Sequence, residues 1–362
     1  MRPLFLVKRW EHHSPAGGYD QLAARYPGAV SIRRGAVDSA AAKLGRRVWY
    51  STFKGWHAVV DYQYGDYLAE RRALWTSLRG GANLVHALYG DEHLDLLLRR
   101  RRWLRAGLVA TFHLPTDTVR ERWERLQPHL AGGIDAAVVV SRSQLADYRR
   151  WLGAERVVYI PHGIDTDRFC PDPGAHAMGR TDGPLRLLTV GQNFRDFEAI
   201  HRLADHCAYR GLAVAFDAVI PTEAASALIG CDNVRVHTGV SEDELISLYR
   251  RADALLLPVT AATANNAVLE SIACGTPVIT NDVGGMADYL DEASGWLLAP
   301  GDQRALTEFV EAMLRDRTVA TAKREGARNR AGLFRWEVVV EQTRAVHEAV
   351  VGGRPPAGAV PS

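Results

Sequence analysis

Short apolar runs alternate with amphipathic stretches along the first half of the chain. Between the runs, apolar residues recur at helical spacing and predict helices over residues 66–78, 91–104, 119–130 and 143–152. The runs themselves predict β-strands at residues 4–7, 29–32, 84–87, 108–112, 136–140 and 157–160. Regular alternation of strands and helices is typical of a doubly wound parallel sheet.

The same pattern starts again after a stretch rich in Pro, Gly and Asp, residues 161–184. Strands are predicted at residues 185–191, 213–220, 233–237, 254–258, 277–280 and 295–298, and helices at 197–210, 243–251, 264–274, 304–315 and 336–351. The fold class is therefore α/β with two Rossmann-like domains. Open sheets of this kind bind ligands at the carboxyl ends of their strands, so we expect a site in a cleft between the two domains.

We expect four parts in this order: an N-terminal domain over residues 1–168, a C-terminal domain over 169–330, a helix over 331–350 returning toward the N-terminal domain, and a disordered tail over 351–362. The chain has 362 residues, which is comfortable for two domains. The tail prediction rests on its Gly, Pro and Ala content.

Composition excludes several classes of protein. The net charge of +2 gives no strong field for nucleic acid, and 47% hydrophobic with 24% charged residues is typical of a soluble globular protein. No apolar run approaches the ~18 residues that span a bilayer, and the N-terminal run is too short for a signal peptide. The cysteines form no paired spacing, which favours reduced thiols in the cytoplasm.

The segment that carries most chemistry runs from Thr263 to Glu270. It is a polar turn between a buried strand and a helix, and its residues Thr263, Ala264, Asn265 and Asn266 precede the acidic Glu270. In a parallel sheet this order places a helix N-terminus, with its unpaired N–H groups, at the ligand-binding edge. Phosphate at those amides and ribose hydroxyls on the carboxylate would together bind a nucleotide.

This segment and four others resemble the retaining glycosyltransferases of family 4, and the resemblance spans most of the chain. The other four contain Gly17-Gly18, the strand ending in His113, the passage 157–165, and residues 190–196. The resemblance implies a GT-B fold, with two Rossmann-like domains facing each other across a cleft. It also implies transfer of a hexose from a UDP- or GDP-sugar to an acceptor hydroxyl, with retention of configuration and without a metal ion or other cofactor.

Two glycine-bearing segments are implied to hold the donor. Gly17 and Gly18 correspond to the family's glycine-rich loop, where the backbone approaches a bound group closely. Gly191, Asn193 and Arg195 follow a strand, and Arg195 is implied to bind the diphosphate as a catalytic cation. A surface ion pair of this arginine with a neighbouring carboxylate is the alternative.

His113 is implied to be catalytic, with its imidazole facing the donor sugar or the departing phosphate. Its alternative role is to cap the strand that it ends. His86 also ends a strand and resembles the family's second histidine segment, with weaker support.

The chain departs from the family at two positions. Gln192 occupies the usual arginine position, which leaves Arg195 as the nearby cation. The family's first glutamate, eight positions before the second, is Ala262 here. Asn265 and Asn266 are candidates to replace its hydrogen bonds, or Asn265 simply caps the helix. These departures keep two alternatives open: a non-hydrolysing nucleotide-sugar epimerase, and a degenerate module that binds a nucleotide sugar without transferring it.

The acceptor is expected to be a small molecule or a lipid-linked compound, recognised by the N-terminal half. An aromatic stretch over residues 49–67 is a candidate for stacking on it. The basic run Arg99–Arg102 predicts weak contact with the inner face of a membrane, against the alternative of a solvated helix face.

Overall fold

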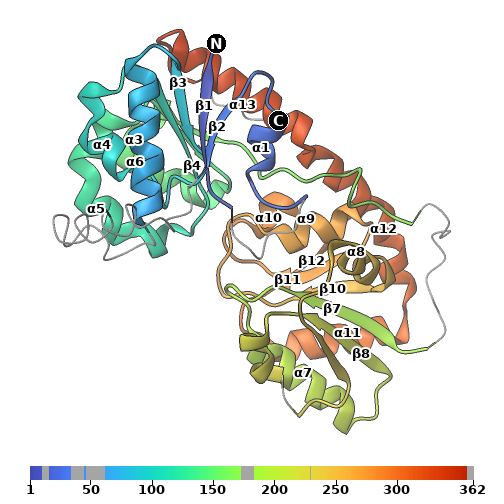
Figure 1. Ribbon diagram of the computed structural model, residues 1–362. Helices are drawn as coiled ribbons and strands as arrows, with labels where there is room; N and C mark the ends of the chain where they lie inside the picture. Colours follow the sequence, from blue (N-terminus) through green and yellow to red (C-terminus); the bar gives the residue numbers. More distant parts are fainter. Residues whose placement is uncertain (10–15, 34–44, 46–61, 173–182, 229, 357–362) are drawn as a thin grey trace. The chain divides into compact units, whose positions relative to one another are not determined.

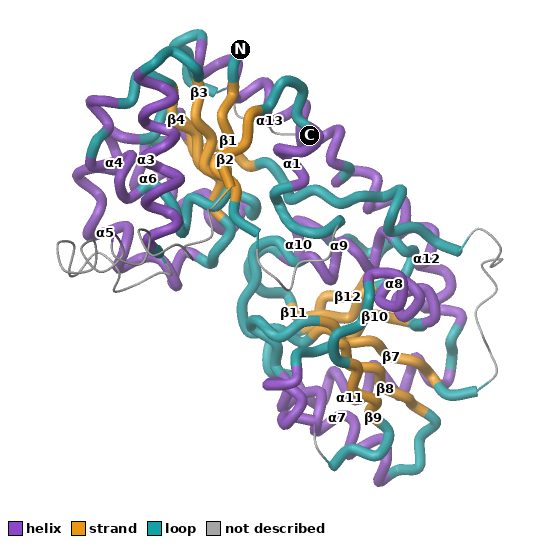
Figure 2. The backbone as a smooth tube through the Cα atoms, in the orientation of Figure 1, coloured by secondary structure: helices purple, strands orange, loops and turns teal. Residues whose placement is uncertain are grey.

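The computed structural model describes residues 1–9, 16–33, 45, 62–172, 183–228 and 230–356 (Figure 1). The chain divides into two compact units. Unit 1 comprises Met1–His13, Gly18–His162 and Trp336–Ser362, and unit 2 comprises Ser14–Gly17 and Gly163–Arg335. Each unit is built around its own parallel sheet, seen as orange strands in Figure 2, so the predicted α/β class with two doubly wound halves is confirmed.

The sheet of unit 1 has six strands in the order β2-β1-β3-β4-β5-β6, all parallel. In the four central strands, β1, β3, β4 and β5, the residues of the predicted apolar runs are almost wholly buried. The strands are β1 (Pro3–Val7), β2 (Val30–Arg33), β3 (Leu84–Ala87), β4 (Gly107–Phe112), β5 (Ala136–Val139) and β6 (Val157–Tyr159).

Helices cover both faces of this sheet. One face packs against α3 (Tyr64–Leu78), α4 (Asp95–Arg99), α5 (Thr116–Gly133) and α6 (Leu145–Leu152). The other face carries α1 (Gln21–Arg25) and the closing helix α13 (Trp336–Val351), which contact each other (Figure 1). The predicted bounds of the closing helix are confirmed.

The prediction of one helix over residues 91–104 is wrong. The helix is limited to α4 and a 3₁₀ turn at Arg101–Trp103. Leu94 has a left-handed backbone, with φ of 89°. The buried Glu70 carboxylate accepts the N–H groups of Leu94 and Leu97, both at 2.9 Å, and so caps α4 from another helix. Hydrophobic spacing cannot reveal this cap, because Glu70 lies 24 positions before Leu94 in the sequence.

A chain of hydrogen bonds fastens α13 to the sheet of unit 1. His347 Nδ1 lies 2.9 Å from the Tyr26 hydroxyl, and its Nε2 lies 2.9 Å from His86 Nδ1. His86 Nε2 lies 2.9 Å from the Thr111 hydroxyl. Since each neutral imidazole donates from one nitrogen and accepts at the other, the donors must all point the same way along the chain.

The sheet of unit 2 also has six parallel strands, in the order β12-β11-β10-β7-β8-β9. All six correspond to predicted strands. They are β7 (Leu185–Val190), β8 (Val214–Val219), β9 (Val234–His237), β10 (Ala254–Leu257), β11 (Val278–Asn281) and β12 (Gly295–Leu298).

Helices cover the two faces of this sheet as well. One face packs against α8 (Glu242–Arg251), α9 (Asn266–Ala273), α10 (Met286–Tyr289) and α12 (Thr318–Ala331), and the other against α7 (Phe197–Tyr209) and α11 (Gln303–Arg315). Sequence reasoning missed α12. Its buried side chains are only alanines, so its apolar stripe is too weak to stand out.

The chain leaves β7 for α7 on one face and leaves β10 for α9 on the other, although β7 and β10 are neighbours in the sheet. Their connecting loops therefore diverge at the carboxyl edge. Doubly wound sheets bind ligands at such switch points, which places the expected site of unit 2 between these two loops.

Candidate functional site

The loops after β7 and β10 lie side by side at this switch point. Arg195 and Val259 form an antiparallel bridge. Asp196 donates its N–H to the Pro258 carbonyl, and Thr260 donates its N–H to the Phe194 carbonyl, each at 2.9 Å. Backbone hydrogen bonds thus join the candidate segment 191–196 to residues 258–260, at the start of the loop that leads to the other candidate segment, 263–270.

Gly191 makes room for the Arg195 side chain. Its backbone is left-handed, with φ of 80°, and a Cβ there would lie 3.1 Å from Arg195 Nη2. The guanidinium donates to the carbonyls of Val190 at 3.0 Å and Asn193 at 2.8 Å. It also reaches Asn265 Oδ1 in the other loop at 3.4 Å. These bonds orient the cation before any ligand arrives.

The carboxylates next to Arg195 in the sequence are engaged elsewhere. Asp196 caps α7 by accepting the N–H of Ala199 at 2.9 Å, and Glu198 pairs with Arg202. Burial lowers the pKa of Arg195 to about 10, so its side chain remains a cation at neutral pH. The arginine is a half-buried, oriented positive charge at the sheet edge.

Glu270 lies on α9 in the same part of unit 2, where the Tyr249 hydroxyl donates to its Oε2 at 2.9 Å. Its side chain is buried, with 6% exposure. The pKa of Glu270 is raised to about 7: burial is the main cause and the charge of Glu242 adds to it, while the Tyr249 hydrogen bond and the charge of Arg195 oppose the rise. Among the described residues, Oε1 has no protein partner, which leaves it an acceptor for a ligand hydroxyl.

The turn between β10 and α9 is built as a helix cap. Asn265 accepts the N–H of Ala267 at 3.1 Å, so the capping alternative for Asn265 is what the structure shows. Thr263 is buried, whereas Ala264 and Asn266 are half-buried. The N–H groups of this first turn point along α9 toward the switch point.

Ala262 occupies the position of the family's first glutamate, and its backbone carbonyl makes a hydrogen bond that shapes the loop. Its carbonyl accepts the N–H of Gly285 at 3.0 Å. Gly284 has a left-handed backbone, with φ of 56°, and a Cβ there would lie 1.9 Å from the Ala262 oxygen. Gly284 and Gly285, which follow β11, therefore fix the position of the loop formed by residues 262–265.

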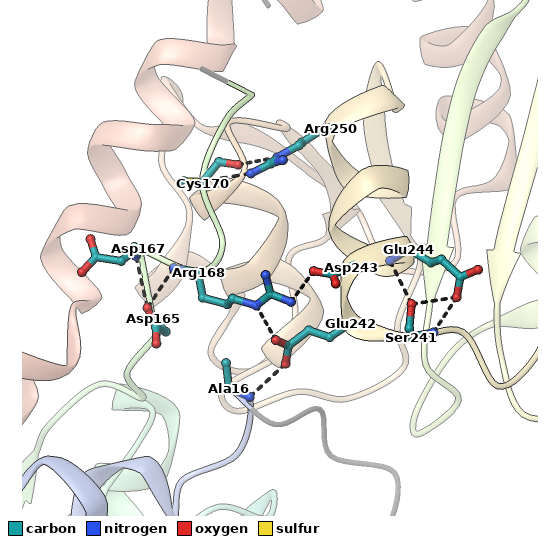
Figure 3. A network of polar contacts seen from close by, with 10 residues as sticks. All are labelled: Ala16, Asp165, Asp167, Arg168, Cys170, Ser241, Glu242, Asp243, Glu244 and Arg250. Atoms are coloured by element: carbon teal, nitrogen blue, oxygen red, sulfur yellow. Dashed lines mark hydrogen bonds and ion pairs between the residues drawn. The ribbon is translucent and has the colours of Figure 1, made fainter. Parts of the chain in front are cut away.

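Glu242, at the start of α8, is a residue that sequence reasoning missed (Figure 3). Its Oε2 accepts the backbone N–H of Ala16 at 2.9 Å, and its Oε1 accepts from Arg168 Nε at 2.6 Å. Figure 3 also shows Arg168 paired with Asp243, on the same helix. Ser241 and Glu244 form a capping box that predicts the helix start, but no local pattern marks partners 74 and 226 positions away.

The same network contains the passage after Gly163. Asp165 accepts the N–H groups of Asp167 at 3.1 Å and Arg168 at 3.0 Å, so its carboxylate ties this turn (Figure 3). Arg168 is thereby placed to reach Glu242. The Glu242 carboxylate thus joins this passage to Ala16, next to Gly17 of the glycine-rich loop.

His113 ends β4 in unit 1, as predicted. Its Nε2 donates to the Leu88 carbonyl at 2.8 Å, and its ring lies against Tyr19 and Tyr89 at centroid distances of 4.6 and 4.8 Å. Asp91 accepts its backbone N–H. Because His113 Nε2 donates its hydrogen to the Leu88 carbonyl, any exchange of a proton with a substrate would use Nδ1.

The other unit 1 predictions are placed as follows. His86 is fully buried and bonded at both ring nitrogens in the α13 network, which is a structural position. Gly18 has φ of 92°, a conformation that favours glycine. Residues 49–61 of the aromatic stretch lie outside the described residues.

The arginines of the basic run 99–102 differ in their surroundings. Arg101 donates to the Gly133 and Leu104 carbonyls and pairs with Asp135. Arg99, Arg100 and Arg102 are exposed. In the part of the chain that the structure describes, no helix is long and apolar enough to cross a bilayer.

Comparison with known proteins agrees with this geometry. The family description "Glycosyltransferase Family 4" matches residues 24–168, and "Glycosyl transferases group 1" matches residues 222–331. The chain is 31% identical to a D-inositol 3-phosphate glycosyltransferase of Salinispora arenicola, over 79% of this chain and 72% of that protein. It is 25% identical to the D-inositol 3-phosphate glycosyltransferase of Xylanimonas cellulosilytica, over 95% of this chain and 82% of that protein.

A solved structure has the same fold. Anabaena HepE in complex with UDP-glucose superposes with a TM-score of 0.71 at 15% identity, covering 96% of this chain and 99% of that one. Sequence matches in both halves and the shared architecture lead to one conclusion: the chain belongs to family 4 of the glycosyltransferases and has the GT-B fold.

Proposed function

We propose that the chain transfers a hexosyl group from a nucleoside-diphosphate sugar to an acceptor hydroxyl, with retention of configuration and without a catalytic metal ion. The observation that carries the proposal is the pairing of an oriented cation, Arg195, with a buried carboxylate, Glu270, at one switch point. Between them lies the N-terminus of α9, capped by Asn265. A diphosphate needs the cation and the helix amides, and a ribose needs the carboxylate.

The same groups explain how the leaving group is stabilised. As the bond between sugar and diphosphate breaks, negative charge grows on the phosphate oxygens. Arg195 is held by three protein acceptors, so little reorganisation is needed when that charge appears. One preorganised donor of this kind contributes about 3 kcal/mol, or roughly a hundredfold in rate. The acceptor hydroxyl attacks the face that the diphosphate leaves.

UDP-glucose is the first donor to test because the fold-related Anabaena HepE was solved with it. GDP-mannose is the second. The names of the relatives make inositol 3-phosphate the first acceptor to test. Exposed Arg100, Arg102 and Trp103 support a lipid-linked acceptor at the inner face of a membrane as the next class. Free cysteines support a reducing, cytoplasmic compartment.

Slow hydrolysis of the donor tests the proposal without knowledge of the acceptor. The protein would be incubated with UDP-glucose or GDP-mannose in excess chelator, and the released sugar followed by NMR before it mutarotates. We expect the α-anomer first, and Arg195→Ala should lower turnover about a hundredfold. Release of the β-anomer first would contradict retention, and loss of turnover in chelator would contradict metal independence.

A degenerate binding module is the second candidate, because Ala262 and Gln192 replace two of the family's usual donor contacts. It predicts nucleotide binding without turnover of any donor. Measurable hydrolysis or transfer that is lost in Arg195→Ala would remove it.

A further inference from the structure

A separate cluster of potential metal ligands lies on α7 and the connection that precedes β9. His201 Nδ1 is 3.2 Å from Asp205 Oδ2, and Cys231 Sγ is 3.5 Å from Asp205 Oδ1. One ligand atom from each of the three residues lies within 4.8 Å of the others. None of the three residues belongs to the Arg195 and Glu270 site.

The Asp205 carboxylate lies next to both other ligands, through a different oxygen to each, and one ligand atom from each residue lies within 4.8 Å of the others, which small shifts of the side chains would bring to the spacing around one small cation. Around a tetrahedral zinc ion, bonds of about 2.0 Å to nitrogen or oxygen and 2.3 Å to sulfur place neighbouring ligand atoms about 3.3–3.8 Å apart. His201 and Asp205 are four positions apart on a helix, so they share one face. Cys231 comes from a different element and is buried at 8% exposure. An imidazole, a carboxylate and a thiol are all ligands that zinc accepts.

The charges around the cluster also favour a cation. The neighbouring cationic residues of α7 have other partners: Arg202 pairs with Glu198 on the same helix and also reaches Gln303, and His206 binds Glu311 on α11 at 2.8 Å. Among the described residues, no lysine or arginine pairs with Asp205. Burial raises the pKa of Cys231 to about 11, with further contributions from Asp205 and Asp232. The carboxylates of Asp205 and Asp232 supply the negative charge that a bound metal ion would neutralise.

We propose that His201, Asp205 and Cys231 form a binding site for a divalent metal ion of the zinc class. Binding converts the Cys231 thiol to a metal-bound thiolate and releases one proton to water; the imidazole and carboxylate donate lone pairs, and water fills the open position. No oxidation is involved. The ion would cross-link the connection before β9 to α7, the helix that starts directly after Arg195. It stabilises unit 2 and takes no part in transfer.

The test uses the full chain, stripped with a chelator and then titrated with Zn²⁺ and Co²⁺. We expect one ion per chain, a thiolate-to-cobalt charge-transfer band, and release of one proton. Below the thiol pKa, affinity should rise about tenfold per pH unit because that proton competes with the metal. Zn²⁺ should also raise the melting temperature of the protein.

Variants identify the ligands. Cys231→Ser should abolish the charge-transfer band, and His201→Gln and the exposed Asp205→Asn should each weaken binding tenfold or more. Controls are His206→Gln, on the same helix but bound to Glu311, and Cys170→Ser, which removes another thiol. Both should bind as the wild type does. Should Cys231→Ser fail to fold, Asp205→Asn carries the test, since that side chain is 56% exposed.

Two results would overturn the site. One is failure of the stripped wild type to bind Zn²⁺ or Co²⁺ stoichiometrically. The other is unchanged affinity in both His201→Gln and Asp205→Asn. Either would leave the cluster as a set of hydrogen bonds that fastens Cys231 to α7. Neither result bears on donor binding at Arg195 and Glu270.

Discussion

At the residue scale, Glu270 combines the proposed role in binding the ribose with a cost in stability. Its pKa is about 7 in the folded protein, against 4.5 ordinarily, because it is buried. The folded state therefore binds more protons than the unfolded state between these values, and the free energy of unfolding falls as pH rises through that window. The loss amounts to about 3 kcal/mol above pH 7, at 1.36 kcal/mol per pKa unit.

Glu270→Gln should therefore stabilise the protein at pH 8 while weakening nucleotide binding. The amide keeps the shape and still accepts from Tyr249, but it carries no charge to bury. We expect up to about 3 kcal/mol more unfolding free energy than the wild type at pH 8, and a difference near zero at pH 4.5. Denaturant unfolding at both pH values measures it, with Glu292→Gln as an exposed control. A variant less stable than the wild type at pH 8 would contradict the raised pKa.

The candidate site was predictable where its signals are local. Gly191, Asn265 and Glu270 each stand at a marked point of a strand–turn–helix pattern, so their places could be expected from the sequence. Tyr249 and Glu242 were not predictable, since each contacts residues that only the folded chain brings near.

At the element scale, the turn after β11 gives a sharp steric prediction. Gly284→Ala would add a Cβ 1.9 Å from the Ala262 oxygen, whereas Gly239 has a similar φ, 63°, and open space around it. Gly239→Ala should cost about 1–2 kcal/mol for its left-handed backbone. Gly284→Ala should cost about 1–3 kcal/mol more, because backbone atoms must move. Equal losses in denaturant unfolding would show that the loop yields freely.

The packing of α13 should depend on pH through its histidine. Burial lowers the pKa of His347 to about 3. The unfolded state therefore takes up a proton near pH 6.5 that the folded state rejects, and stability falls as pH falls from 6.5 toward 3. A proton on this ring would make both of its nitrogens donors, so the Tyr26 hydroxyl could only accept from Nδ1 and His86 Nδ1 could only accept from Nε2.

His347→Gln should remove its share of this pH dependence, because an amide does not titrate. Between pH 7.5 and pH 5, the wild type should lose about 2 kcal/mol more unfolding free energy than the variant. His237→Gln, a less buried histidine, is the matched control. Parallel losses in the wild type and His347→Gln would contradict the account.

The elements themselves were largely predictable because period-2 and period-3.6 patterns are strong in buried strands and two-sided helices. All twelve strands of the part of the chain that the structure describes correspond to predicted runs. The failures have physical causes: Glu70, on another helix, caps the start of α4 at Leu94, and the buried side chains of α12 are only alanines.

At the scale of the whole molecule, the chain is a family 4 glycosyltransferase with the GT-B fold, and two positions of its sequence depart from the family pattern. Fold and family follow from patterns spread over both halves. The identity of the donor does not follow from them, because Ala262 and Gln192 stand where the resemblance implies a glutamate and an arginine. The central claim is that Arg195 and Glu270 bind a nucleoside diphosphate.

Thermal shift with nucleotides tests that claim most directly. UDP, GDP and ADP would be measured against the wild type, Glu270→Ala and Arg195→Ala, with the 2′-deoxy form of the best nucleotide as a ligand control. We predict selective stabilisation by one ribonucleotide, about 2.7 kcal/mol at a hundred times Kd, and weaker stabilisation by its deoxy form. Both variants should lose the shift. An undiminished shift in Glu270→Ala and Arg195→Ala would contradict the account.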